Sequence, residues 1–157
     1  MDDSAWLRLV VTGSREYREK REVFRVLDAI HARWPVRLLG EGGCRRYDKD
    51  RNLRPVSADL YAHWWCEYRG VTCLTVFARW AAEGRAAGPR RNERMLDLVN
   101  PHIVVAFPGG DGTRNIVQVA VNAGFRQMEA ETPPATLFLS PILPASFTGR
   151  QSERPSV

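Results

Sequence analysis

Short apolar runs alternate with amphipathic segments along most of this chain, and this alternation constrains its fold more than any other feature. The runs typical of strands are residues 7–11, 36–39, 71–77, 103–107 and 136–139. The segments with helical spacing of apolar residues are 16–34, 57–69, 89–99 and 113–122. Such alternation favours parallel strands covered by helices on both faces. We therefore expect an α/β fold, a single Rossmann-like three-layer domain with a mostly parallel sheet.

The chain has 157 residues, which suffices for one domain with a hydrophobic core. We assign residues 1–140 to that domain and interpret the polar, arginine-rich stretch 44–56 as a loop insertion within it. Residues 141–157 are rich in proline, serine and arginine, so we expect a flexible tail there. The hydrophobic fraction of 44% and the charged fraction of 26% are typical of a globular protein and exclude general disorder.

The formal net charge is +5, and nearly all of the positive charge is arginine, because Lys20 and Lys49 are the only lysines. Arginine suits the recognition of phosphate and carboxylate groups, although a GC-rich genome gives the same bias. No apolar run approaches the roughly 20 residues of a membrane helix. Three cysteines without a signal-peptide pattern are typical of a reducing compartment. We therefore expect a cytoplasmic protein without a membrane partner.

The sharpest local signal is the sequence Pro-Gly-Gly-Asp-Gly-Thr at residues 108–113, between a predicted strand and a predicted helix. Glycine allows the backbone to approach a ligand closely and to adopt positive φ. The N-terminus of the next helix offers free N–H groups and a partial positive charge, which together bind anions. We expect a phosphate group to be held by Gly109, Gly110, Gly112 and Thr113, with an unliganded tight turn as the alternative.

Two further glycine-bearing loops follow predicted strands, at residues 12–15 and 40–43. Right-handed crossovers place all strand-to-helix loops of a parallel sheet at one edge, where such sheets bind ligands. Each loop taken alone is equally well explained as a plain turn. Taken together, they predict further ligand contacts from Gly13, Ser14, Arg15, Gly42 and Gly43.

Arginines crowd the first turns of the predicted helix 89–99, after a glycine- and alanine-rich stretch. Cations are unfavourable at a helix N-terminus, and an anionic ligand relieves that cost. Arg91 and Asn92 are therefore candidate ligand contacts, with a solvated arginine face as the alternative. Asp59 follows the predicted N-cap Ser57, where helix capping is the ordinary role and a contact to ribose hydroxyls is the functional hypothesis.

The chain has no convincing metal-binding pattern. His63 and Cys66 are one helical turn apart, but Cys73 and His102 have no matching partners nearby in the sequence. We therefore expect no metal site and no cofactor.

Together these motifs resemble the YspA (cpYpsA-related) branch of the SLOG superfamily. The resemblance runs from about residue 7 to about residue 125 and is carried by Thr-Gly-Ser-Arg at 12–15, Gly-Gly at 42–43, Ser-Ala-Asp at 57–59, Gly-Arg-Ala-Ala-Gly-Pro at 84–89 with Arg91, Asn92 and Met95, and Pro-Gly-Gly-Asp-Gly-Thr at 108–113. It implies a Rossmann-like nucleotide site, and such relatives often form dimers. The superfamily includes the LOG phosphoribohydrolases and the DNA-processing protein DprA, and many members are thought to sense or process nucleotide signals.

Two features depart from the LOG pattern. The catalytic glutamate of LOG enzymes falls at Asn115 here, and an amide cannot act as a general base. Their catalytic arginine falls at Arg91 and is present. The stretch 44–56 splits what resembles a compact Gly-Gly-Ala-x-Gly-Ala-Asp loop in the family, and we interpret it as a lid over the ligand or a partner surface.

We predict that the chain binds a nucleotide or nucleotide-derived small molecule. The first hypothesis is an enzyme that hydrolyses the N-glycosidic bond of a nucleoside 5′-monophosphate, with Arg91, Asp59 and Glu41 as catalytic residues. The alternative is a non-catalytic sensor of a nucleotide or ADP-ribose-type signal, which the missing glutamate favours. A DprA-like nucleic-acid-binding module is a further, less favoured alternative. We also expect a homodimer, with the apolar helix face at Trp64 and Trp65 as its candidate surface.

Overall fold

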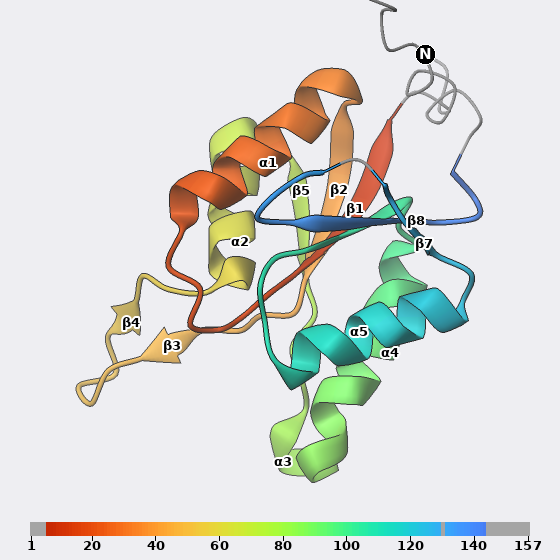
Figure 1. Ribbon diagram of the computed structural model, residues 1–157. Helices are drawn as coiled ribbons and strands as arrows, with labels where there is room; N and C mark the ends of the chain where they lie inside the picture. Colours follow the sequence, from red (N-terminus) through yellow and green to blue (C-terminus); the bar gives the residue numbers. More distant parts are fainter. Residues whose placement is uncertain (1–5, 130, 144–157) are drawn as a thin grey trace, which may run out of the picture.

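The computed structural model describes residues 6–129 and 131–143 and is drawn in Figure 1. Its main sheet has six strands in the order β5-β2-β1-β6-β8-β7. In chain order these are β1 (Leu7–Thr12), β2 (Val36–Glu41), β5 (Thr72–Thr75), β6 (Ile103–Ala106), β7 (Arg126–Gln127) and β8 (Thr136–Leu139). The helices are α1 (Lys20–Arg33), α2 (Ala58–Arg69), the short α3 (Trp80–Glu83) with a 3-10 turn at Gly84–Ala86, α4 (Ala87–Val99) and α5 (Asp111–Asn122). The chain is thus an α/β protein, compatible with a Rossmann-like fold.

The sheet is mostly parallel, as predicted, but not wholly so. Strands β5, β2, β1 and β6 run parallel, whereas β8 pairs antiparallel with β6 and β7 antiparallel with β8. A parallel neighbour needs a crossover of a dozen or more residues. Only residues 128–135 separate β7 from β8, so these two strands pair antiparallel. The sequence gives no sign of β7, because two residues carry no periodicity.

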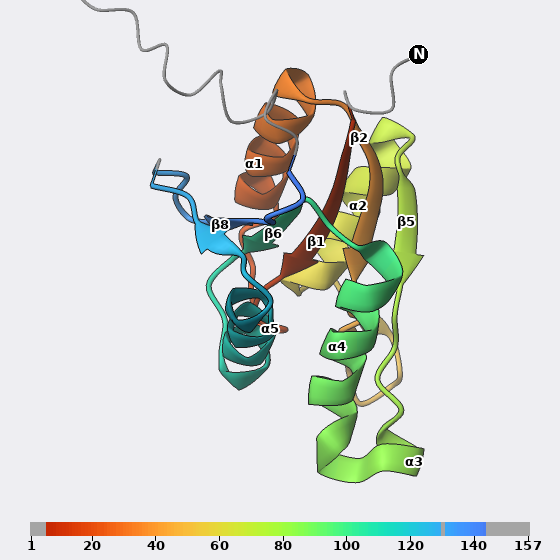
Figure 2. The ribbon, with the colours of Figure 1, turned by 90° about the vertical axis from the view of Figure 1, so that its right-hand side faces the viewer.

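Two hydrophobic clusters lie on opposite faces of the sheet. Leu9 and Val11 of β1 pack in one cluster with buried side chains of α1 and α2. Val10 packs in the other cluster with Met95 of α4 and Ile116 of α5. Successive strand side chains point to opposite faces, so β1 needs apolar residues at consecutive positions. Figure 1 shows α1 and α2 on one side of the strands, and Figure 2 shows α4 and α5 as neighbours.

The four longer predicted helices are present, and their starting residues differ in three cases. α2 begins where predicted, because the hydroxyl of Ser57 accepts a hydrogen bond from the Leu60 N–H at 3.0 Å. α1 begins at Lys20 rather than at residue 16, α4 begins two residues before Pro89, and α5 begins two residues before Thr113. The first turn of a helix tolerates proline, since its N–H groups have no partner within the helix.

The stretch 44–56 is more ordered than the loop that we predicted. It contains the short antiparallel strands β3 (Arg46–Tyr47) and β4 (Leu53–Arg54). Asp48 stabilises their turn, because its Oδ1 accepts a hydrogen bond from the Asn52 N–H at 2.9 Å. Figure 1 shows this hairpin projecting away from the main sheet.

The prediction that Trp65 belongs to a dimer surface on α2 is wrong. Its side chain is 0% exposed, and its indole N–H donates a hydrogen bond to Oδ1 of Asp28 in α1 at 2.8 Å. Trp64 is half-buried and packs beside Tyr61 and Lys20. This apolar face of α2 covers the sheet and α1, so burial within the chain explains its composition.

Within residues 6–129 and 131–143, no helix is both long enough and apolar enough to cross a membrane. The tail predicted at 141–157 falls outside the described residues from residue 144 onward.

Candidate functional site

The three glycine-bearing loops meet at the carboxyl edge of the parallel strands, as the topology predicts. The Ser14 N–H after β1 donates to the carbonyl of Pro108 after β6 at 2.8 Å. The carbonyl of Ser14 in turn accepts from the Ala58 N–H in the first turn of α2 at 3.1 Å. Gly13 lies so close to Ala58 and Phe107 that an added Cβ would come within 2.6 Å of the Ala58 side chain. The loop at 12–15 is therefore packed between the loop at 108–113 and the first turn of α2.

The loop at 108–113 needs glycine for close packing at one position. A Cβ added at Gly109 would overlap the side chain of Thr113 and lie 3.0 Å from the Ser14 nitrogen. Gly110 and Gly112 have open space around them. None of these three glycines is among the positive-φ residues of the described chain, contrary to our expectation. Gly110 is the N-cap of α5, and no side chain in the described part of the chain caps that helix.

Arg91 connects α4 to the loop after β2. It is 8% exposed, and its guanidinium donates hydrogen bonds to the carbonyl of Gly42 and, at 2.8 Å, to Oδ1 of Asn92. A Cβ added at Gly42 would lie 2.8 Å from the guanidinium carbon, so glycine is required for this contact. The arginine-rich start of α4 is thus only partly a solvated face, because Arg91 is buried at the loop edge.

Asn92 connects the same helix to the phosphate-loop candidate. Its side-chain amide donates to the carbonyl of Gly112 at 3.2 Å and to Oδ1 of Asn115 at 2.9 Å. Asn115 stands where the LOG pattern has a catalytic glutamate. In this structure it is an acceptor for Asn92, a role that a glutamate oxygen also fills.

Asp59 is a buried carboxyl beside Arg91 and the insertion. It is 5% exposed, and its Oδ2 accepts a hydrogen bond from the Cys44 N–H at 3.1 Å. Burial, and then the negative charge of Glu41, raise the pKa of Asp59 to about 6, although Arg91 acts in the opposite direction. A carboxyl group with a pKa near neutrality is suited to proton transfer and is typical of functional sites.

Glu41 is held more tightly than Asp59. Its side chain is 0% exposed, and it forms an ion pair with Arg45 at 3.0 Å. Its Oε2 also accepts a hydrogen bond from the Gly43 N–H at 2.8 Å. The carboxylate therefore fixes the conformation of the loop at 40–43, which leaves Asp59 as the better placed of the two predicted catalytic acids.

The sequence analysis did not predict three residues that lie at this edge. The Cys44 thiol lies between Asp59 and Arg91, and burial followed by the charge of Asp59 raises its pKa to about 12, so it stays neutral. Phe77 contacts Gly43 and is 62% exposed, while Trp80 lies near Gly88 and is 61% exposed. For Phe77 and Trp80, the sequence signal that was available is an aromatic residue close to a glycine- and arginine-rich segment.

The remaining predicted contact, Arg15, is exposed at the same edge. A separate surface groove of about 700 Å³ lies between α1 and α2, away from all of these residues. It is lined by Lys20, Arg21, Phe24, Arg25, Asp28, Tyr68 and Arg69.

Comparison of the chain with protein-family models, with curated proteins and with solved structures found no match.

Proposed function

We propose that this chain is a three-layer Rossmann-like domain of the SLOG type that binds a nucleotide or a nucleotide-derived ligand by its phosphate. The N-terminus of α5 carries this proposal, because no side chain in the described part of the chain caps it. Its first N–H groups lack partners within the helix. A phosphate satisfies those groups and complements the helix dipole. Gly110 has open space around it, which leaves room for such a close approach.

The loop after β1 supports the same position for the phosphate. Ser14 is fixed against Pro108 by its backbone hydrogen bond. The hydroxyl of Thr113 lies in the first turn of α5, 3.5 Å from the hydroxyl of Thr12. A hydroxyl at this point of the helix is well placed to donate to a phosphate oxygen. Arg15, exposed on the adjacent loop, adds a cation that suits a planar phosphate contact.

The rest of the ligand extends toward the loop after β2. We assign the ribose to the neighbourhood of Asp59 and Arg91, which the loop at 42–44 joins. We assign the base to Phe77, whose exposed ring lies against Gly43. Bases stack on aromatic side chains with little dependence on sequence.

Hydrolysis of the N-glycosidic bond of a nucleoside 5′-monophosphate is the activity that this arrangement supports best. Cleavage of a glycosidic bond develops positive charge on the sugar and requires proton transfer to the leaving group or from water. Asp59 supplies the proton-transferring carboxyl group, and Glu41 holds the loop beside it. Arg91 fixes the Gly42 carbonyl and places a positive charge near Asp59.

A non-catalytic sensor is the second candidate, and Asn115 favours it. Its amide is engaged by Asn92 at 2.9 Å and provides no acid–base group at the position that LOG enzymes use. Under this hypothesis the same residues bind a nucleotide or an ADP-ribose-type signalling molecule without cleaving it.

Calorimetry with nucleoside 5′-monophosphates and the matching nucleosides tests the binding. We expect the nucleotides to bind at least tenfold more tightly, because only they occupy the α5 N-terminus. Gly109→Ala places a methyl group into Thr113 and should weaken nucleotide binding at least tenfold. Gly88→Ala, in α4 and outside the loop, is the matched control: its added Cβ would meet the Trp80 ring at an ordinary 3.4 Å, and affinity should stay close to wild type. Equal binding of nucleosides, or no nucleotide binding at millimolar concentration, contradicts the proposal.

Chromatographic detection of free base from a panel of ribo- and deoxyribonucleoside monophosphates separates the two candidates. The hydrolase predicts base release that Asp59→Asn abolishes while nucleotide binding persists. Tight binding without base release across the panel assigns the chain to the sensor class.

A further inference from the structure

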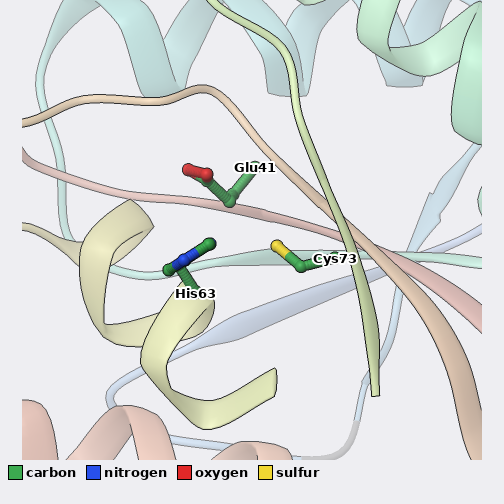
Figure 3. Close-up of side chains that lie close together, drawn as sticks. All are labelled: Glu41, His63 and Cys73. Atoms are coloured by element: carbon green, nitrogen blue, oxygen red, sulfur yellow. The ribbon is translucent and has the colours of Figure 1, made fainter. Parts of the chain in front are cut away.

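Three side chains with metal-binding atoms meet below the loop edge, from three separate elements. Glu41 ends β2, His63 lies in α2 and Cys73 lies in β5. One ligand atom from each of them lies within 4.8 Å of the other two. Figure 3 shows the three side chains close together. The sequence analysis found no partner for Cys73, because these residues are 10 to 32 positions apart and only the fold assembles them.

His63 is oriented as metal-binding histidines usually are. Its Nε2 lies 3.0 Å from Oε1 of Glu67, one helical turn further along α2. When the Nε2–H group donates a hydrogen bond to that carboxylate, the neutral imidazole keeps its lone pair on Nδ1. Nδ1 is buried and has no hydrogen-bond partner in the described part of the chain. A carboxylate that holds one imidazole nitrogen while the other binds the ion is a recurrent arrangement in metal sites.

Glu41 has capacity for one more partner. A carboxylate has about four lone-pair sites. Oε2 accepts from the Gly43 N–H at 2.8 Å and from Arg45 at 3.2 Å, and Oε1 accepts from Arg45 at 3.0 Å. These three bonds leave a lone pair on Oε1 among the described contacts. The carboxylate is fully buried and already fixed, so binding an ion costs it little conformational freedom.

Cys73 completes the donor set. Its thiol lies beside the thiol of Cys66, which is buried in α2 three residues after His63, and beside the His63 side chain itself. A thiolate, an imidazole and a carboxylate are the ligand types that zinc takes in proteins. Tetrahedral bonds of about 2.0–2.3 Å to one ion set neighbouring ligand atoms about 3.3–3.8 Å apart. The three atoms lie within 4.8 Å of one another, so small side-chain adjustments bring them onto one ion.

We propose that Glu41, His63 and Cys73 form a zinc-binding site with three protein ligands, whose fourth position is open to water. Binding displaces the thiol proton of Cys73 to the solvent, since the thiolate is the ligand. The site does not depend on nucleotide binding, because none of its three ligands is needed to hold the phosphate at α5.

Titration of the reduced full-length protein with Co²⁺ under anaerobic conditions tests this site. We expect one equivalent to bind, with intense visible bands of tetrahedral cobalt and a thiolate-to-cobalt charge-transfer band in the near ultraviolet. Zn²⁺ should displace Co²⁺ and bleach both. Wild-type protein without a charge-transfer band overturns the proposal.

Variants assign the ligands. Cys73→Ser should lose the charge-transfer band, and Cys44→Ser, the same change outside the cluster, should retain it. Glu67→Gln leaves all three ligands in place and alters an exposed side chain, so it should fold normally and weaken Zn²⁺ binding about 10- to 100-fold. Circular dichroism without metal verifies the fold of each variant. A band that survives Cys73→Ser, or Zn²⁺ affinity unchanged in Glu67→Gln, contradicts the assignment.

Discussion

The phosphate-loop candidate at 108–113 and the Glu41–His63–Cys73 cluster are built in opposite ways. The loop offers backbone N–H groups, lies at the surface and comes from one continuous segment. The cluster offers side-chain atoms, joins the buried Glu41 to the half-buried His63 and Cys73, and draws on β2, α2 and β5. A contiguous backbone site is visible as a motif, whereas a side-chain site from three elements has no sequence pattern. As proposed, the two sites take ligands of opposite charge at one edge of the sheet.

The two regions share a neighbour in the loop at 40–43, which connects them. Glu41 belongs to the cluster, and the next residue, Gly42, accepts the hydrogen bond of Arg91. Changes at Arg91 should therefore affect the proposed nucleotide site and leave metal binding in place, because Arg91 contacts Gly42 and none of the three metal ligands.

Arg91→Met should have the largest effect. It leaves the Gly42 carbonyl and Asn92 without their donor and removes the positive charge beside the buried Asp59. We expect a loss of about 3–5 kcal/mol in the free energy of unfolding and of about 100-fold in nucleotide affinity. Urea denaturation and calorimetry measure the two, and the Co²⁺ spectrum should be unchanged. Arg90→Met, an exposed change at the adjacent position, is the control and should alter stability by less than about 0.5 kcal/mol.

The pH dependence of stability should report on Asp59. Its pKa is raised to about 6 in the folded protein, so the folded state binds this proton more strongly than the unfolded state does. The unfolding free energy should therefore fall as pH rises from about 4 to 6 and then level off, by about 2–3 kcal/mol from this group. Asp59→Asn removes this titration. The unfolding free energy of the variant, relative to that of the wild type, should therefore rise over the same pH range. A constant difference in urea midpoints across these pH values contradicts the burial of a titrating carboxyl at this position.

Thr113→Val should have an intermediate effect restricted to the nucleotide site. It keeps the shape of the first turn of α5 and removes the hydroxyl that we assign to a phosphate oxygen. Loss of one hydrogen bond to a charged group corresponds to about tenfold in affinity. Calorimetry with a nucleoside monophosphate and with its nucleoside measures it, and the nucleoside affinity should stay the same. Thr72→Val, an exposed threonine on β5, is the matched control.

Ser57→Ala should have the smallest effect, and it should reach both regions. The Ser57 hydroxyl accepts from the Leu60 N–H and donates to the Cys44 carbonyl at 2.8 Å, so it ties α2 to the insertion. Loss of an N-cap costs about 1 kcal/mol. Because α2 carries both Asp59 and His63, nucleotide and Co²⁺ affinities should each fall by no more than a few fold. A large loss at one site alone would mean that the cap positions that site specifically.

The order of elements and most of the loop edge were predictable from local patterns. The Ser57 cap, the strand at Thr136–Leu139 and the convergence of the loops at 12–15, 40–43 and 108–113 follow from residue types that act over a few positions. β7 and the hairpin within 44–56 were not predictable, because strands of two residues show no alternation. The hydrogen bonds from Asn92 to Gly112 and Asn115 depend on how α4 packs against α5, and no local sequence pattern encodes that packing.

By itself, the sequence determined that this chain forms a mostly parallel α/β sheet and that a glycine-rich loop follows its fourth parallel strand. Apolar periodicity and backbone freedom decide these features within single segments. Only the tertiary structure decided that Arg91 reaches Gly42, that Asp59 is buried beside it, and that Cys73 meets His63 and Glu41. The packing of helices on the sheet fixes those distances, because it brings side chains far apart in the chain into one low-dielectric region where their charges and lone pairs interact.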